Sequence, residues 1–254
     1  MPGSDAGAVV TLRKLRLLML VGTAKKVAFI LNRISCPAST RLSLVAGIRT
    51  QMEMEQFFSS VAWKLSGEKS QAVSELRELN TVWLDIQQPN GFNFRGWREY
   101  QSRDILSNKK VLPTFRERED GDLNLTLNWN SFTEPPPMVW ETKAIQKMCS
   151  FMPVQDAKHI YLVNARGDAI SVIADLLFSD KHSPWPVITN LVLHKIDFSS
   201  KIAGVAEILS ALFLRTRWNM PIENFVLLEC TDVRETDITS LATVVEHVEW
   251  DGRT

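Results

Sequence analysis

The sequence predicts an α/β solenoid of irregular repeats, with parallel strands on the inner wall and helices outside. Three observations predict this class: an apolar pattern that returns seven times, helix-spaced apolar stripes between its copies, and a composition with 45% hydrophobic residues and balanced charge. At 254 residues, the chain is long enough to bury a continuous core in such an array.

The repeated pattern has the form apolar-x-x-apolar-x-apolar, which suits a short buried strand. Its clearest copies are Ile188 to Leu193 and Ile222 to Leu227, and Cys230 follows the second copy where leucine-rich repeats place Asn or Cys. The middle apolar residues of the seven copies are Leu18, Leu42, Val82, Leu125, Ile160, Leu191 and Phe225. We therefore expect a leucine-rich-repeat-like domain over residues 12–254, after a disordered N-terminal tail of residues 1–11.

The segments between these copies show the 3.6-residue period of helices that pack on one side. An alternation of strand and helix favours a parallel sheet with right-handed crossovers, and each unit then needs its neighbour to cover its apolar face. The stripes are Val27, Ile30, Leu31 and Ile34; Met54, Phe57, Phe58, Val61 and Leu65; Ile145, Met148, Cys149 and Met152; Ala169, Val172, Ile173, Leu176 and Leu177; Ile202, Val205, Ala206 and Leu209; and Ile238, Leu241 and Val245.

Two segments interrupt the pattern. Residues 95–122 contain seven basic and six acidic side chains with little periodicity, which predicts a charged insertion or lid. Pro135, Pro136 and Pro137 predict a stiff bend. Both segments are interpreted as tolerated surface loops, with contact to a partner as the alternative.

No catalytic, cofactor-binding or metal motif is recognisable in the sequence, so we expect no enzyme, no cofactor and no metal site. Phosphate-loop, dinucleotide-binding, nucleophile-elbow and zinc-helix patterns are all missing. The three cysteines, Cys36, Cys149 and Cys230, are far apart, which suggests reduced thiols in the cytoplasm or nucleus.

Charge and hydropathy argue against two classes of partner, nucleic acids and membranes. The 29 basic and 29 acidic residues argue against nucleic acid as the partner, and the apolar run from Leu17 to Val21 is too short to span a membrane. The basic residues among positions 1–34 would also suit a mitochondrial presequence, but the strand and helix patterns there favour a structural role. We therefore expect a protein partner.

Strand alternation predicts which side chains the repeats turn outward from the inner wall. These residues form a mixed aromatic and polar set of the composition typical of protein-binding patches, although insertions could instead cover this wall. The six residues predicted to bind protein there are Trp83, Asp85, Asn128, His159, Tyr161 and His194.

Several phrases of the sequence resemble the repeat region of basidiomycete F-box proteins with leucine-rich repeats. They are LRKLRLLML at the start, CPASTRLSL from Cys36, PVITNLVLHKIDF from Pro186 and the closing V-x-W-D at Val248 to Asp251, and the resemblance covers residues 12–252. It implies a substrate-recognition array of a ubiquitin ligase. Residues 1–14 contain nothing similar to an F-box opening, so binding to the ligase adaptor is in doubt.

The sequence thus predicts a non-catalytic protein-binding scaffold of the substrate-receptor type. Two alternatives stay open. One is a divergent α/β hydrolase or transferase, which would need a deep pocket with convergent polar groups. The other is a truncated, non-functional fragment of a longer F-box protein.

Overall fold

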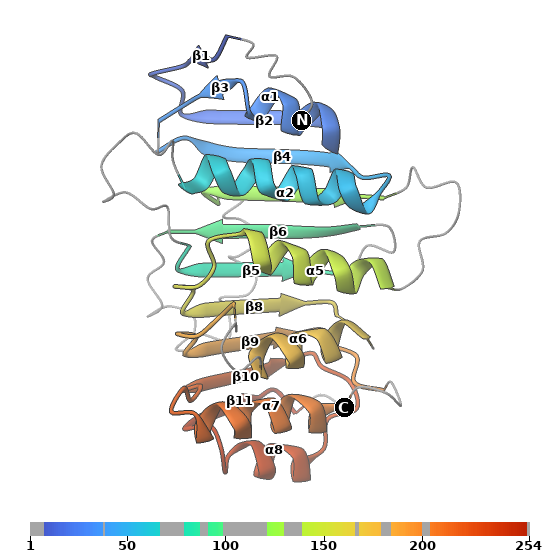
Figure 1. The fold of residues 1–254 in the computed structure, drawn as a ribbon. Coiled ribbons are helices and arrows are strands. Elements are labelled where there is room, and N and C mark those ends of the chain that lie inside the picture. Colours follow the sequence, from blue (N-terminus) through green and yellow to red (C-terminus); the bar gives the residue numbers. More distant parts are fainter. Residues whose placement is uncertain are drawn as a thin grey trace.

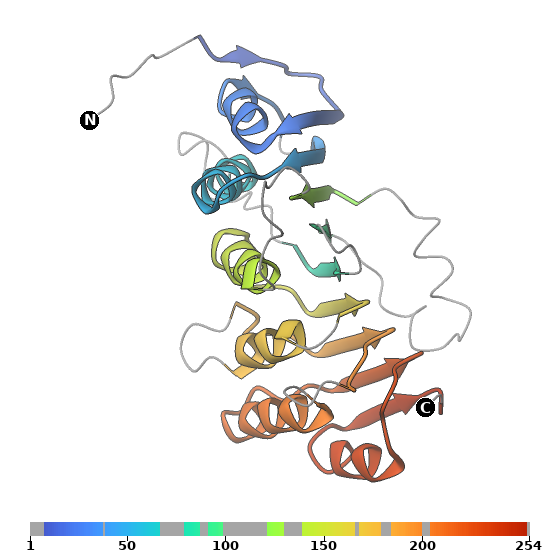
Figure 2. The ribbon, with the colours of Figure 1, turned by 90° about the vertical axis from the view of Figure 1, so that its right-hand side faces the viewer.

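A computed structural model shows that the chain forms a mixed α/β structure with one large sheet. It describes residues 8–37, 39–66, 79–86, 91–98, 121–129, 139–165, 168–178, 184–199 and 204–252. The sheet has nine strands, and the helices of the described residues line up along one of its faces (Figures 1 and 2). In spatial order the strands are β2 (Leu17–Thr23), β4 (Arg41–Gly47), β7 (Leu123–Asn128), β6 (Gly91–Trp97), β5 (Thr81–Asp85), β8 (His159–Val163), β9 (Asn190–His194), β10 (Asn224–Leu228) and β11 (His247–Trp250).

Six helices are described beside the sheet, and a separate parallel pair of two-residue strands lies near the N-terminus. The pair consists of β1 (Val10–Thr11) and β3 (Ile34–Ser35). The helices are α1 (Ala24–Leu31), α2 (Gln51–Ser66), α5 (Val139–Phe151), α6 (Asp168–Phe178), α7 (Val205–Arg217) and α8 (Glu235–Leu241).

All seven copies of the apolar pattern form strands of the large sheet, which confirms the strand prediction. The seven strands also run in the same direction. The pairs β2–β4, β4–β7, β5–β8, β8–β9 and β9–β10 are parallel, and β5 and β7 are each antiparallel to the strand β6 between them. The sheet is therefore mostly parallel, as expected.

The order of the strands differs from the prediction that successive copies pair with each other. β4 pairs with β7 rather than with β5, and β5 pairs with β8. The reason is β6, which turns back beside β5 and then pairs with β7, so that β7 occupies the place next to β4. Phe92 and Phe94 of β6 are at most 1% exposed, and their burial gives this extra strand its place in the core.

The core lies between the sheet and the helices. Alternate strand residues such as Leu42, Leu125 and Leu191 are almost fully buried, and the complete predicted stripe of α2 is buried against them. The stripe predicted for α7 is confirmed only in part. Val205 is buried and Leu209 packs against the core, but Ala206 is exposed, and Ile202 lies outside the described residues. The buried face continues through Ile208, Leu212 and Arg215.

The backbone itself repeats after each of the last four strands. A residue with positive φ follows β8, β9 and β10 directly, and a fourth lies two residues after β11, in register with the other three. The four residues are Asn164, Lys195, Glu229 and Gly252, with φ between 50° and 71°. Because side-chain-bearing residues rarely adopt this conformation, its recurrence shows that the chain leaves each strand by the same turn.

The predicted bounds of the N-terminal tail and of the charged insertion both differ from the structure. Val10–Thr11 is a strand inside the predicted tail of residues 1–11, and Arg95–Trp97 belongs to β6 rather than to an insertion over 95–122. Residues 1–7, residues 99–120 and the three prolines at 135–137 lie outside the described residues.

Candidate protein-binding surface

One face of the sheet lies opposite the helices, and we call it the open face (Figure 2). The strand residues that alternate with the core residues lie on it. Across β5, β8, β9 and β10 these residues form three rows: one at the amino ends of the strands, one in the middle and one at the carboxyl ends. The rows differ in chemistry.

The middle row is apolar. Trp83, Tyr161, Val192 and Val226 follow one another in register, and the last three form a small buried cluster against which Trp83 packs. Arg95 is the register partner of Trp83 on β6, and its guanidinium lies 4.5 Å from the centroid of the indole ring. A cation at that distance over an aromatic face is attracted by the ring electrons.

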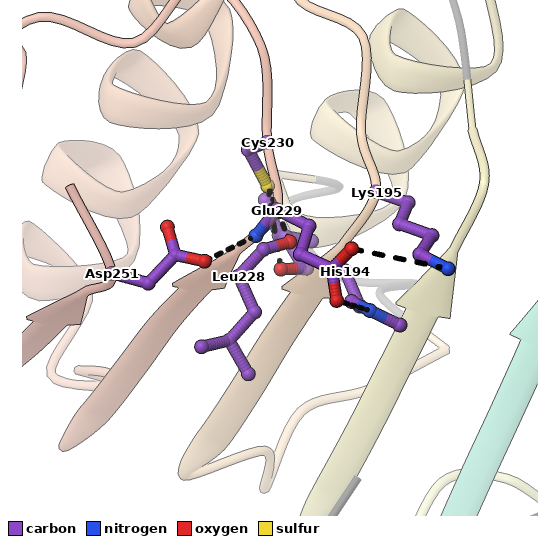
Figure 3. Close-up of polar contacts among 7 residues, drawn as sticks. His194, Lys195, Leu228, Glu229, Cys230 and Asp251 are labelled. Atoms are coloured by element: carbon purple, nitrogen blue, oxygen red, sulfur yellow. Dashed lines mark hydrogen bonds and ion pairs between the residues drawn. The ribbon is translucent and has the colours of Figure 1, made fainter. Parts of the chain in front are cut away.

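The carboxyl-end row alternates polar Asp85 and His194 with apolar Val163 and Leu228, and residues that follow the strands add charged groups beside it. His194 Nε2 lies 3.3 Å from Glu229 Oε1, and Lys195 Nζ lies 4.0 Å from Glu229 Oε2. The backbone N–H of Glu229 donates to Asp251 Oδ2 at 2.8 Å, which ties the ends of β9, β10 and β11 together (Figure 3). We call His194, Lys195, Glu229 and Asp251 the carboxyl-end cluster. Lys195 and Glu229 are the residues with positive φ that directly follow β9 and β10.

The amino-end row is polar and mostly neutral. Asn224 Nδ2 donates to Asn190 Oδ1 at 2.8 Å, and Asn190 Nδ2 donates to Thr189 Oγ1 at 2.8 Å. His159 lies beside Asn190 in register. Burial, helped by the nearby positive charge of Lys158, holds the pKa of His159 below its ordinary value, so the ring is neutral at physiological pH.

The six residues predicted to bind protein all lie on strands of the large sheet, at positions that alternate with the core residues. The structure brings Trp83 and Tyr161 together as register neighbours. Asp85 and His194 share the carboxyl-end row but are separated by β8, and Asp85 instead accepts a hydrogen bond from Asn164 at 2.9 Å. His159 and Asn128 lie apart from these groups, so the six residues do not form one cluster.

The prediction that Tyr161 is exposed is wrong. Its side chain is only 2% exposed, and its neighbours Val192 and Val226 are 3% and 5% exposed. Alternation places a side chain on a face of the sheet correctly, but it does not tell whether other parts of the chain cover that position. Trp83, His159 and His194 are partly exposed and remain accessible to a partner.

Sequence reasoning did not include Arg95, Asn190 or Glu229 among the binding residues. Arg95 was assigned to the charged insertion, although the alternation of Phe92, Asn93, Phe94 and Arg95 was a period-2 signal. Glu229 directly follows a strand, where the direction of a side chain depends on the turn rather than on alternation. No pattern in the sequence predicts the left-handed conformation of Glu229.

The carboxyl-end cluster contains no activated nucleophile. Cys230 is adjacent to Glu229, but its thiol is buried and donates to the carbonyl oxygens of Leu193 and Leu228, both at 3.4 Å. Burial raises the pKa of Cys230 to about 11, so the reactive thiolate is not formed at neutral pH. The histidine and the cysteine therefore do not make a nucleophile–base pair.

Within the described ranges, no group of three or more His, Cys, Asp or Glu side chains is arranged to hold a metal ion. None of the helices in the same part of the chain is both long and apolar enough to cross a bilayer.

Comparison with models of protein families, with curated proteins and with solved structures gives no match for this chain. The structure itself defines the class: an α/β protein with an open, mostly parallel sheet and helices along one face.

Proposed function

We propose that the chain is a non-catalytic protein-binding scaffold and that its open face receives a segment of a partner protein. One observation carries the proposal: Trp83, with the Arg95 guanidinium over its ring, lies partly exposed on a sheet face on which the structure describes no helix, with polar side chains toward both ends of the strands. Tryptophan and arginine are the residues that most often dominate binding energy at protein interfaces. The flanking amide and charged groups would supply orientation and specificity.

We further propose that the architecture is a leucine-rich-repeat-like solenoid with one irregular stretch. The recurring left-handed residue after β8, β9, β10 and β11 supports a repeated unit in the last third of the chain. The helices line one side of the strands throughout the described residues, as the units of such an array require (Figure 1). β6 is the irregular element.

The resemblance to F-box proteins with leucine-rich repeats extends this proposal. It makes the bound protein a substrate presented for ubiquitin transfer, in the cytoplasm or the nucleus. Binding to the ligase adaptor is not part of the proposal.

Selection of a displayed random-peptide library on the purified chain tests the binding role. Peptides enriched on the parent chain should bind the Trp83→Ala variant at least tenfold more weakly, a loss of about 1.4 kcal/mol. Arg95→Ala, which removes the guanidinium over the indole, should weaken the same peptides while leaving the core intact. Dissociation constants would be measured by biolayer interferometry.

Phe213→Ala is the matched control, because Phe213 is 50% exposed on α7 and lies on the helix side of the sheet. Its peptide affinities should equal those of the parent. Enriched peptides that bind both open-face variants normally, or that lose affinity with Phe213→Ala instead, would contradict the proposed surface. Thermal melts of each variant separate lost binding from lost folding.

A further inference from the structure

The charges of the chain are segregated toward the two ends of the sheet. Residues 6–52, which contain β2 and β4, have eight Lys and Arg residues and no Asp or Glu. Residues 218–251, which contain β10 and β11, have eight Asp and Glu residues and a single arginine. The net charge of the chain is zero, but one end of the sheet is basic and the other is acidic.

The two ends are also the two edges of the sheet. β2 is the last strand of the large sheet at the basic end and β11 is its last strand at the acidic end, while the short β1–β3 pair lies beyond β2 (Figure 1). In the described part of the chain, no strand pairs with the outer edge of either one. Both strands run in the same direction, so β11 of one molecule could pair with β2 of another in parallel, with the helices of both on the same side.

Both edges leave apolar side chains partly uncovered. On β2, Leu17, Met19 and Val21 are 51%, 62% and 74% exposed. On β11, Val248 and Trp250, which lie on the helix side of the sheet and not on the face of the three β2 residues, pack against the core but are only partly buried. An exposed edge strand with apolar side chains is a template for further strand pairing unless it is covered.

The cations around β2 and the carboxylates around β11 lie at corresponding positions along the two strands. Arg13, Lys14 and Arg16 are exposed just before β2, and Glu246 is exposed just before β11. Lys25 and Lys26 are exposed just after β2, where a parallel pair would bring them near the end of β11 with Glu249. Among the residues that the structure describes, no carboxylate pairs with any of the five cations.

We propose that two copies of this chain associate head to tail, with the basic β2 edge of one copy against the acidic β11 edge of the next. Contact between two β2 edges or between two β11 edges would bring like charges together, which opposes both symmetric arrangements. A head-to-tail contact is heterologous, so each dimer keeps one free end of each kind and can grow into longer chains.

Charge reversal at one end at a time tests this arrangement. The basic-end variant combines Arg13→Glu, Lys14→Glu and Arg16→Glu, and the acidic-end variant combines Glu246→Lys and Glu249→Lys. All five positions are exposed, so both variants should keep the fold, as circular dichroism would verify. A control variant combines Lys143→Glu and Lys158→Glu, which are exposed cations in the middle of the array.

Sedimentation velocity should show that the mass of the parent and the control rises with concentration in low salt and falls at about 0.5 M salt, where charges are screened. Each end variant alone should remain a monomer at both salt concentrations. An equimolar mixture of the two variants should associate again, because each variant supplies the intact end that the other lacks and the two reversed ends also carry opposite charges.

A parent that stays monomeric in low salt would overturn the proposal, as would an end variant that still assembles alone or a mixture that stays monomeric. A parent that is monomeric but binds anionic phospholipid vesicles or an oligonucleotide through Arg13, Lys14 and Arg16 would also overturn it, and would assign the basic edge to a polyanion.

Discussion

Arg215 is a buried cation that joins two helices. Its guanidinium, on α7, donates to the carbonyl oxygen of Leu177 at 3.1 Å and to that of Pro186 at 3.4 Å. Leu177 lies in the last turn of α6, where carbonyl groups lack helical partners and the helix dipole favours a positive charge. Burial lowers the pKa of Arg215 to about 10, so it stays protonated at neutral pH.

Replacing Arg215 with alanine should lower the free energy of unfolding by about 2–3 kcal/mol, because it leaves buried carbonyl groups without donors and opens a cavity. Arg215→Met should cost less, since methionine refills most of the volume. Urea denaturation of the three proteins would measure the difference. Equal loss in both variants would show that the hydrogen bonds, rather than the packing, dominate.

His159 should make the stability of the protein depend on pH. Its pKa is depressed in the folded state, mainly by burial, so the unfolded chain binds a proton more readily. The stabilisation is therefore complete above the pKa of the unfolded chain, about 6.5, and is lost as the pH falls through the lower pKa of the folded state. Lowering the pH from neutral should destabilise the parent more than His159→Gln, as judged from melting temperatures across that window. Parallel curves for the two proteins would contradict this assignment.

At the scale of single elements, apolar periodicity identified every strand that follows the repeated pattern. It missed β6, where Phe92 and Phe94 alternate with Asn93 and Arg95, because the dense charge that follows Arg95 is typical of a loop. It also predicted only part of the buried face of α7. A helix in which Arg215 is buried and Ala206 is exposed does not follow from hydrophobicity alone.

A pair of substitutions at and before β9 tests which of its side chains lie in the core. Leu191 is fully buried, so Leu191→Asp should place an unpaired charge in the core and unfold the strands around it, a loss above about 4 kcal/mol. Val187 precedes the same strand and is 42% exposed, so Val187→Asp should change stability by less than about 0.5 kcal/mol. Chemical denaturation compares them, and similar losses in both variants would contradict the burial of Leu191 in the core.

At the scale of the whole molecule, the sequence predicted the parallel direction of seven strands but not their order. Local patterns give the face that each strand buries, whereas pairing depends on contacts between distant segments, here β4 with β7 and β5 with β8. The same limit applies to the surface. Alternation places Trp83 and His194 on the correct face, but it does not predict that Tyr161, clustered with Val192 and Val226, is only 2% exposed.

The antiparallel strand β6 also restricts how such a chain can change in length. From β8 to β11 each strand pairs with the next strand in the sequence, so a whole strand–helix unit could be duplicated or lost there without altering any other pairing. Between β4 and β8 the order along the chain and the order in the sheet differ. Removing one strand there would leave two others without partners, so gains and losses of units among natural variants should fall in the C-terminal third.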